Sequence, residues 1–239
     1  MTPVAKAEWQ ELFGTESDAD NPIPQTTSTI SKTELEELFG EDSDAEDNLQ
    51  TPSVSCAVTP TTFPDIPGLS IAYGALPLDL RQHLLQNISK EQWFDPSNAR
   101  DQVMRFGTLP SWLHPLLDIG ASLLPDHLKA RTLQFDQLIA NYYTPGQGLS
   151  YHVDLLNRFE DGIIVASIFG SCVMEFRPAA HIRDLSNPLI PTTPVLLSAG
   201  DVVCLHGPAR WDWEHGIPSR TEDDWEGKIG INNSEKIEA

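Results

Sequence analysis

Two residue types that bind metal ions stand two positions apart in the chain, at His152 and Asp154. They follow a turn-forming stretch, 144–148, and residues two apart in an extended segment point to the same face, so both side chains can reach one ion. His215, inside the segment 211–218, is the best candidate for a third ligand. Two imidazoles and one carboxylate leave three positions open on Fe(II), which is what a site that activates O2 requires. The pattern therefore predicts a non-haem iron site.

Spacing alone leaves a second interpretation open, because the chain contains seven histidines and short motifs occur by chance. Each of the three side chains could instead be an ordinary hydrogen-bonded residue. Histidines without a carboxylate pattern nearby are interpreted as structural: His83, His114, His127 and His181. His206 ends a predicted strand shortly before His215, so a role beside the metal ligands or facing the substrate stays open.

The elements that must position these residues change in type along the chain. Apolar residues recur at helical spacing over 77–90 and 111–124, which predicts two helices whose apolar stripes belong to the scaffold. After Leu133 the pattern is typical of short strands, expected at about 134–143, 162–169, 171–177, 194–198, 201–206 and 211–217. Short strands without helices between them predict a mainly β (α+β) domain, a double-stranded β-helix or jelly roll with the early helices packed on one sheet.

The beginning of the chain has a different composition. Residues 1–55 contain 13 acidic and 2 basic side chains and few apolar ones, so we expect 1–60 to form a disordered acidic tail before a folded domain over 61–239. An acidic motif containing Glu-Leu-Phe-Gly occurs twice, at 11–20 and 37–46. The two copies either dock in the groove of a protein partner or are a low-complexity duplication without a partner.

Composition also restricts the class of protein. The net charge of −20 weighs against tight, non-specific binding of nucleic acid, although a local basic groove remains compatible with it. The chain has no apolar run of about 18 residues and no signal-peptide pattern, so we expect no membrane span and an intracellular monomer, in the nucleus, the cytoplasm or both. Cys56, Cys172 and Cys204 form no paired pattern and are expected to be reduced thiols.

Longer stretches around the candidate ligands resemble a known family. In order, they are 138–143 (Leu-Ile-Ala-Asn-Tyr-Tyr), 145–149 (Pro-Gly-Gln-Gly-Leu), 152–154 (His-Val-Asp), 159–161 (Phe-Glu-Asp), 163–176, 197–203 (Leu-Ser-Ala-Gly-Asp-Val-Val), 207–211 (Gly-Pro-Ala-Arg-Trp) and 215–217 (His-Gly-Ile). Together they resemble the AlkB-like Fe(II)/2-oxoglutarate-dependent dioxygenases over residues 66–218. Because the motifs occur in the family's order, the resemblance is specific and supports the metal assignment.

The resemblance implies a set of cofactors and a reaction. Fe(II) would be bound by His152, Asp154 and His215, with 2-oxoglutarate and O2 as co-substrates. Asn141 and Tyr143 would hydrogen-bond 2-oxoglutarate, Tyr143 at its far carboxylate; without the family, both would be taken for polar strand residues. Oxidative decarboxylation to succinate and CO2 would drive hydroxylation of a nearby C–H bond, and a hydroxylated N-methyl group would leave as formaldehyde.

The same resemblance suggests substrate contacts. Segment 101–107 resembles the family's substrate lid, in which Arg105 would meet a phosphate and Phe106 or Trp112 would stack on a base. The alternative is that the two aromatic residues belong to the core. Arg210 would either orient the substrate or brace the strand that carries His215.

The C-terminal region departs from the family pattern. Relatives carry a strand resembling Arg-x-Ser-x-Thr-x-Arg, whose first arginine pairs with the 2-oxoglutarate carboxylate, whereas this chain has no arginine after Arg220. Lys228, a point charge without the guanidinium fork, or Arg220 would then have to bind the carboxylate. Otherwise the chain is a truncated or mis-spliced form of an active enzyme, which its polar ending favours, or a catalytically weak relative used for binding.

The family acts mostly on alkylated bases, so we expect a nucleic-acid substrate in DNA or RNA. The segment 152–176 most resembles the branch that hydroxylates a modified uridine at the tRNA wobble position. Leu156 stands where repair members often place an acid that touches the base, which argues against direct base repair. The alternatives are a protein or lipid substrate, favoured by the acidic balance, and a non-catalytic interaction protein that uses its acidic tail.

Overall fold

The computed structural model describes residues 58–94, 101–129, 135–183 and 191–223, all of which belong to one compact unit, Asp47–Ala239. The acidic motifs at 11–20 and 37–46, nearly all of the expected tail and Lys228 lie outside the described residues. Within them, no helix combines the length and the apolar character needed to cross a membrane.

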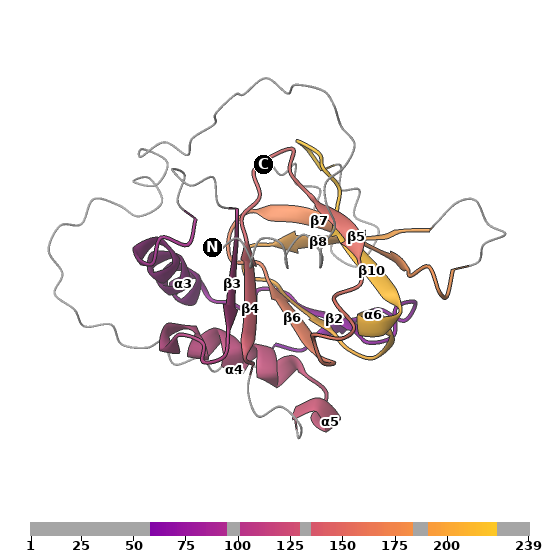
Figure 1. The fold of residues 1–239 in the computed structure, drawn as a ribbon, viewed down its shortest axis with the longest axis horizontal. Coiled ribbons are helices and arrows are strands. Elements are labelled where there is room, and N and C mark those ends of the chain that lie inside the picture. The colour runs from indigo at the N-terminus through magenta and orange to yellow at the C-terminus, as the bar shows by residue number, and fades with distance from the viewer. Residues whose placement is uncertain (1–57, 95–100, 130–134, 184–190, 224–239) are drawn as a thin grey trace, which may run out of the picture. The chain divides into compact units, whose positions relative to one another are not determined.

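Two antiparallel sheets of four strands each form the body of the domain (Figure 1). The first has the order β1 (Thr61–Thr62), β2 (Leu69–Ala72), β9 (Val202–Leu205) and β6 (Ile163–Ala166). The second has the order β5 (Leu149–His152), β10 (Trp213–Ile217), β7 (Ser171–Pro178) and β8 (Thr193–Ser198). Two such sheets confirm the predicted jelly roll, and a separate pair, β3 (Gln102–Phe106) with β4 (Gln137–Asn141), lies beside them.

The core between the two sheets is built by alternation along each strand. Ile71 and Val203 from the first sheet pack in one cluster with Met174 and Phe176 from the second. All four residues of β9 are buried, because Val203 and Leu205 join that cluster while Val202 faces the helices. A strand covered on both faces loses the apolar–polar alternation of a half-exposed strand, which is why the sequence around β9 is continuously apolar.

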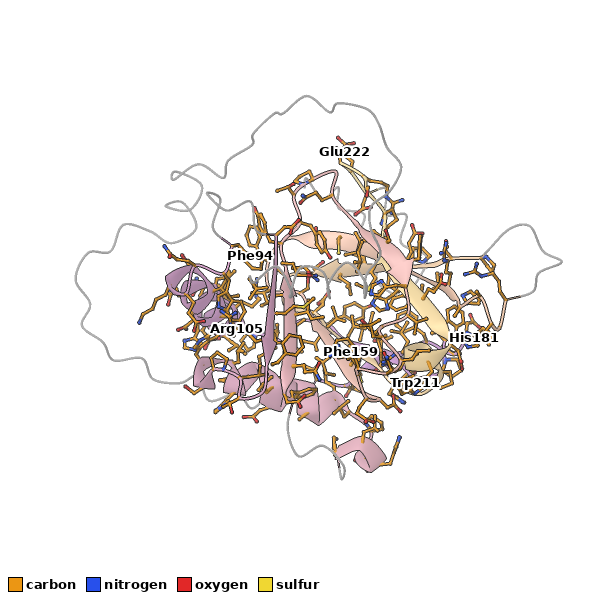
Figure 2. All side chains as sticks on the ribbon, in the orientation of Figure 1. Phe94, Arg105, Phe159, His181, Trp211 and Glu222 are labelled. Carbon is orange, nitrogen blue, oxygen red and sulfur yellow. The ribbon has the colours of Figure 1, made fainter. Side chains whose placement is uncertain are left out.

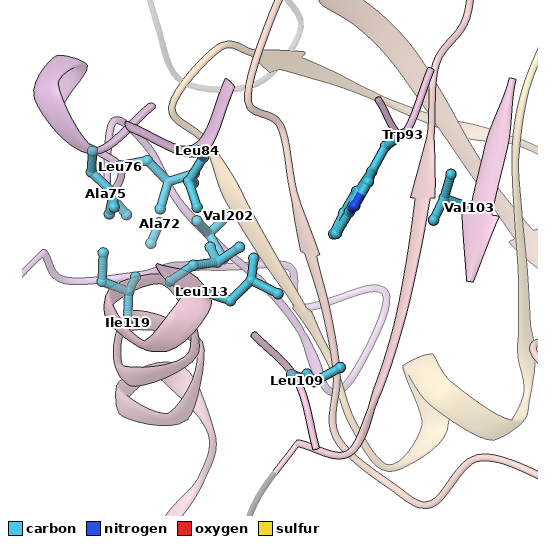
Figure 3. Packing of buried hydrophobic residues seen from close by; sticks show 12 residues of the cluster. Ala72, Ala75, Leu76, Leu84, Trp93, Val103, Leu109, Leu113, Ile119 and Val202 are labelled. Atoms are coloured by element: carbon cyan, nitrogen blue, oxygen red, sulfur yellow. The ribbon is translucent and has the colours of Figure 1, made fainter. Parts of the chain in front are cut away.

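The predicted helices are confirmed as α3 (Leu78–Lys90) and as a 3-10 turn, Ser111–Leu113, that leads into α4 (His114–Leu123). Their buried side chains, including Leu80 and Leu84, pack with Val202 and Val103 in a second cluster (Figure 3). Gly120 allows α4 to approach β6, since a Cβ there would lie 3.3 Å from side-chain atoms of Ile164. The glycine therefore allows the helix to pack closely on the strand.

Several elements were not predicted. The short strands β1, β2 and β3 precede the region in which strands were expected, and α5 (Asp126–Lys129) follows α4. The expected strand 211–217 starts later, at Trp213, because the helix α6 (Pro208–Trp211) occupies the preceding residues. These elements are at most five residues long, so they offer little periodicity from which to predict them.

Candidate metal centre

The three predicted ligands come together because two strands that are distant in sequence are neighbours in one sheet. β5 and β10 pair antiparallel, with His152 directly opposite His215. Asp154 follows β5 and faces both rings: its carboxylate oxygens lie 3.6 Å from His152 Nε2 and 3.8 Å from His215 Nε2. A β-bulge between His215 and Ile217 interrupts the register just beyond the ligand, a device that can re-aim a side chain at a site.

The donor atoms fit a divalent metal ion. One atom from each of the three side chains lies within 4.8 Å of the others, and two ligands about 2.1 Å from a shared ion are at most about 4.2 Å apart. The two distances to Asp154 satisfy this limit. His152 Nδ1 donates a hydrogen bond to the Ser150 carbonyl at 2.9 Å, which leaves the Nε2 lone pair for the metal. Two imidazoles and one carboxylate suit Fe(II) with open positions.

Burial and mutual charge set the protonation of the three groups. Burial lowers the pKa of His215 to about 4, against the opposing effect of Asp154. Burial also disfavours charge on His152, but the Asp154 carboxylate and the Ser150 carbonyl outweigh it and raise its pKa. The pKa of Asp154 is lowered, because the contact with His152 and the nearby positive charges overcome its burial. The carboxylate is therefore ionised and His215 neutral near pH 7, as metal ligands must be.

An aromatic side chain supports the second histidine. Phe176 is fully buried, stands opposite His215 in the β10–β7 pairing, and its ring centroid lies 6.2 Å from the imidazole. The two histidine rings are 4.6 Å apart. The inner face of the second sheet thus holds His215 against the core, whereas His152 is only half-buried.

Arg210 does not have the surroundings expected of a substrate-binding residue. Its side chain is 1% exposed, and its guanidinium donates hydrogen bonds to main-chain carbonyls of the segment that follows Asp154. It therefore has no surface to offer a substrate. The group that it holds is the segment 154–160, and the expected brace of the His215 strand stays a prediction.

The β3–β4 pair separates its residues onto two faces. Neighbouring side chains on a strand point to opposite faces, so Phe106 and Gln102 share one face of β3, and Arg105 lies on the other. Gln102 stands opposite Asn141 and donates to its Oδ1 at 2.8 Å. The ladder continues at Tyr142, whose N–H donates to the Asp101 carbonyl, so Tyr143 returns to the face of Asn141.

Tyr143 lies near β7 of the second sheet. Burial raises its pKa to about 12, with smaller contributions from the nearby Asp101 and Cys172. Cys172 lies on β7 and packs in the cluster between the sheets, as Phe176 does. The predicted 2-oxoglutarate residues Asn141 and Tyr143 and the exposed Phe106 therefore share a face of the β3–β4 pair, and Tyr143 places that face near the inner side of β7.

Arg105 lies on the opposite face of β3, with its side chain 41% exposed. Its expected contact with a substrate phosphate stays a prediction. Its guanidinium lies over the Trp93 ring at 5.1 Å and 3.8 Å from Glu91, while Val103 on the same face packs into the helix cluster. Glu91 also accepts hydrogen bonds from the indoles of Trp93 and Trp112, both at 2.7 Å. Arg105 and Trp112 are thus joined to the end of α3; Figure 2 shows Arg105 on this side, near Phe94.

Arg220 makes two ion pairs within the described residues, and its expected role toward 2-oxoglutarate stays a prediction. It pairs with Glu175 at 3.2 Å and with Asp223 at 3.0 Å. Glu175 is next to Phe176 on β7, and Phe176 faces the core with His215, so Glu175 and its partner lie on the outer face of the sheet. The role predicted for Lys228 falls outside the described residues.

The remaining histidines take no part in the metal cluster of the described residues. His206 follows β9 of the first sheet, and its ring lies edge-on to that of His127, with the two centroids 6.3 Å apart. His181, expected to lack a carboxylate, contacts Asp212 at 2.9 Å.

Two groups that orient the site were not predicted from the sequence, Gln102 and the Ser150 carbonyl. Their positions relative to Asn141 and His152 depend on strand register, which the sequence does not reveal.

Comparison with known proteins agrees with this geometry. Residues 79–235 match the model of the 2OG-Fe(II) oxygenase superfamily. The alkylated DNA repair protein ALKBH8 homolog of Arabidopsis thaliana is 30% identical over 203 residues, covering 72% of this chain and 57% of that protein. The tRNA (carboxymethyluridine(34)-5-O)-methyltransferase ALKBH8 of Macaca fascicularis is 34% identical over 146 residues, covering 60% of this chain but 20% of that protein.

A protein of Acanthamoeba polyphaga mimivirus, L905, is 27% identical over 173 residues, covering 67% of this chain and 78% of its own length. The chain therefore spans a little over half of the Arabidopsis relative and a much smaller part of the macaque one. The family match covers the strands β3 to β10 and the three metal ligands. This chain belongs to the 2OG-Fe(II) oxygenase superfamily and is similar to its AlkB-like members.

Proposed function

We propose that this chain hydroxylates or oxidatively demethylates a base in a nucleic acid, with RNA that carries a modified uridine as the first substrate to test. Membership of the superfamily makes it a dioxygenase that uses Fe(II), 2-oxoglutarate and O2. When bound, the iron and 2-oxoglutarate supply the oxidising power for C–H hydroxylation, with succinate and CO2 as co-products. His152, Asp154 and His215 would hold the iron, and Asn141 and Tyr143 the co-substrate.

The observation that carries the proposal is the position of Phe106. Its side chain is 62% exposed and lies on the same face of the β3–β4 pair as Asn141, although it stands opposite Gln137, four residues along β4 from Asn141. An exposed aromatic ring beside a cofactor face can stack on an unpaired base, a contact worth about 1–3 kcal/mol per base. Relatives named for a modified tRNA uridine indicate which base to test first.

The charge of the protein affects how such a substrate would be bound. Arg105, Arg210 and Arg220, three of the arginines of the described domain, are engaged within the protein. Binding should therefore depend on the base more than on phosphates, and affinity should fall only weakly with salt. Leu156, two positions after Asp154, is 61% exposed and would offer a bound base an apolar contact.

The test is turnover of defined RNA by the full chain loaded with Fe(II). Succinate release and the mass of the digested nucleosides are measured for anticodon-loop RNA containing carboxymethyluridine, for the same RNA without the modification, and for 1-methyladenine oligonucleotides. We expect a product heavier by one oxygen atom from the modified uridine only. His152→Ala, which removes a ligand, is the inactive control. Iron binding and uncoupled 2-oxoglutarate turnover without any nucleoside product would refute the proposed substrate class.

A further inference from the structure

Arg210 is the most deeply buried charged side chain among the described residues. Its Nη2 donates to the carbonyls of Phe159 at 2.8 Å and Leu155 at 3.2 Å, Nη1 donates to that of Asp154 at 3.0 Å, and Nε donates to that of Glu160 at 3.2 Å. The guanidinium also lies over the ring of Trp211 at 4.2 Å. A single side chain therefore holds four main-chain carbonyls of one loop.

The position of Arg210 in the chain connects this loop to the metal site. Arg210 belongs to α6, which leads through Asp212 directly into β10, the strand of His215. The loop that it holds begins at Asp154. A second hydrogen bond also joins α6 to this segment. Gly207, at the start of α6, donates its N–H to the Asp161 carboxylate at 2.9 Å. α6 and the residue before it thus hydrogen-bond to both ends of the segment 154–161.

We infer that Arg210 is a positioning residue for the metal carboxylate: it keeps the segment after Asp154 folded before metal binds, so that Asp154 already faces both histidines. The inference rests on the metal site and not on the nucleic-acid substrate proposed above. A planar guanidinium with five N–H donors can reach several carbonyls at once, whereas the ammonium of lysine acts from a single point. Outer groups of this kind typically contribute roughly 10- to 100-fold to metal affinity.

The experiment measures metal affinity of the full chain by competition with a chelator, with Mn(II) as the probe. Arg210→Lys and Arg210→Met are compared with wild type at a temperature at which circular dichroism shows all of them folded. We expect the dissociation constant to rise about tenfold or more for Arg210→Lys and further for Arg210→Met. Arg183→Lys is the matched control, because Arg183 donates to Pro178 and Glu214 on the outer face of the second sheet.

A lower melting temperature with an unchanged dissociation constant would overturn the inference, since Arg210 would then be only structural. A second measurement needs no variant. The N–H groups of Arg158 and Phe159 donate to the Leu155 carbonyl within the loop, so hydrogen exchange of the metal-free wild type should show them protected. Exchange at the rate of an unfolded peptide, with protection appearing only after Mn(II) is added, would show that the metal and not Arg210 orders the loop.

Discussion

Acidification of the metal-free protein should destabilise it through one side chain, His215. Burial lowers the pKa of this imidazole to about 4, against about 6.5 in an unfolded chain. A pKa lowered on folding means that the unfolded state takes up the proton first, so the contribution of His215 is present above pH 6.5 and is lost as the pH falls towards 4. The loss amounts to about 3 kcal/mol at pH 4.

The neighbouring groups act in other pH ranges. His152 has a raised pKa, so its contribution is complete below about pH 6.5 and is lost only as the pH rises through the raised value. Asp154 has a lowered pKa, and its contribution is lost only below about pH 4. Of these three groups, His215 is therefore the one that changes the free energy of unfolding between pH 4 and pH 6.5.

The assay is urea unfolding of the full chain in the presence of a chelator at pH 7, 6, 5 and 4, for wild type and for His215→Gln, which stays neutral throughout. Titrating groups far from His215 cancel in the difference between the two proteins. Asp154, which contacts His215, has a pKa lowered below this interval of pH. The free energy of unfolding of wild type, relative to the variant, should fall by about 3 kcal/mol between pH 7 and pH 4. A difference that is the same at both pH values would refute the buried, neutral state of His215.

Three further substitutions test other parts of the structure. Gly68→Ala should cost more than about 3 kcal/mol, because φ is +93° and the new Cβ would lie 1.8 Å from the His206 carbonyl oxygen; an unchanged melting temperature would contradict this conformation. Phe106→Ala should raise the KM for modified RNA about tenfold with little effect on melting temperature, since the ring is exposed; an unchanged KM would exclude stacking. Tyr143→Phe should weaken 2-oxoglutarate binding about tenfold through loss of a hydrogen bond to a carboxylate, measured by titration of the metal-loaded protein, and equal affinities would remove Tyr143 from the site.

The sequence by itself determined those features that depend on local pattern. The apolar spacing in 77–90 and 111–124 predicted two helices that the structure contains. The short apolar runs after Leu133 predicted β4 and β6 to β10, but not β5, which carries His152. The pair His152 and Asp154 was recognisable because alternation on a strand is a property of the backbone itself. In each case the signal lies within a few consecutive residues.

Tertiary structure alone decided which distant residues meet and which face each side chain takes. His215 reaches the site because β10 pairs with β5 in a register that sets it opposite His152. Arg105 and Phe106 are adjacent in sequence. Only the pairing of β3 with β4 and the packing of Val103 on the helices show which of the two lies on the same face as Asn141. From the sequence, Arg210 could be a cation that binds substrate. In the structure its guanidinium donates hydrogen bonds to main-chain carbonyls of a loop that is distant in sequence. Strand register and burial arise from contacts between segments far apart in the chain, so no local pattern can encode them.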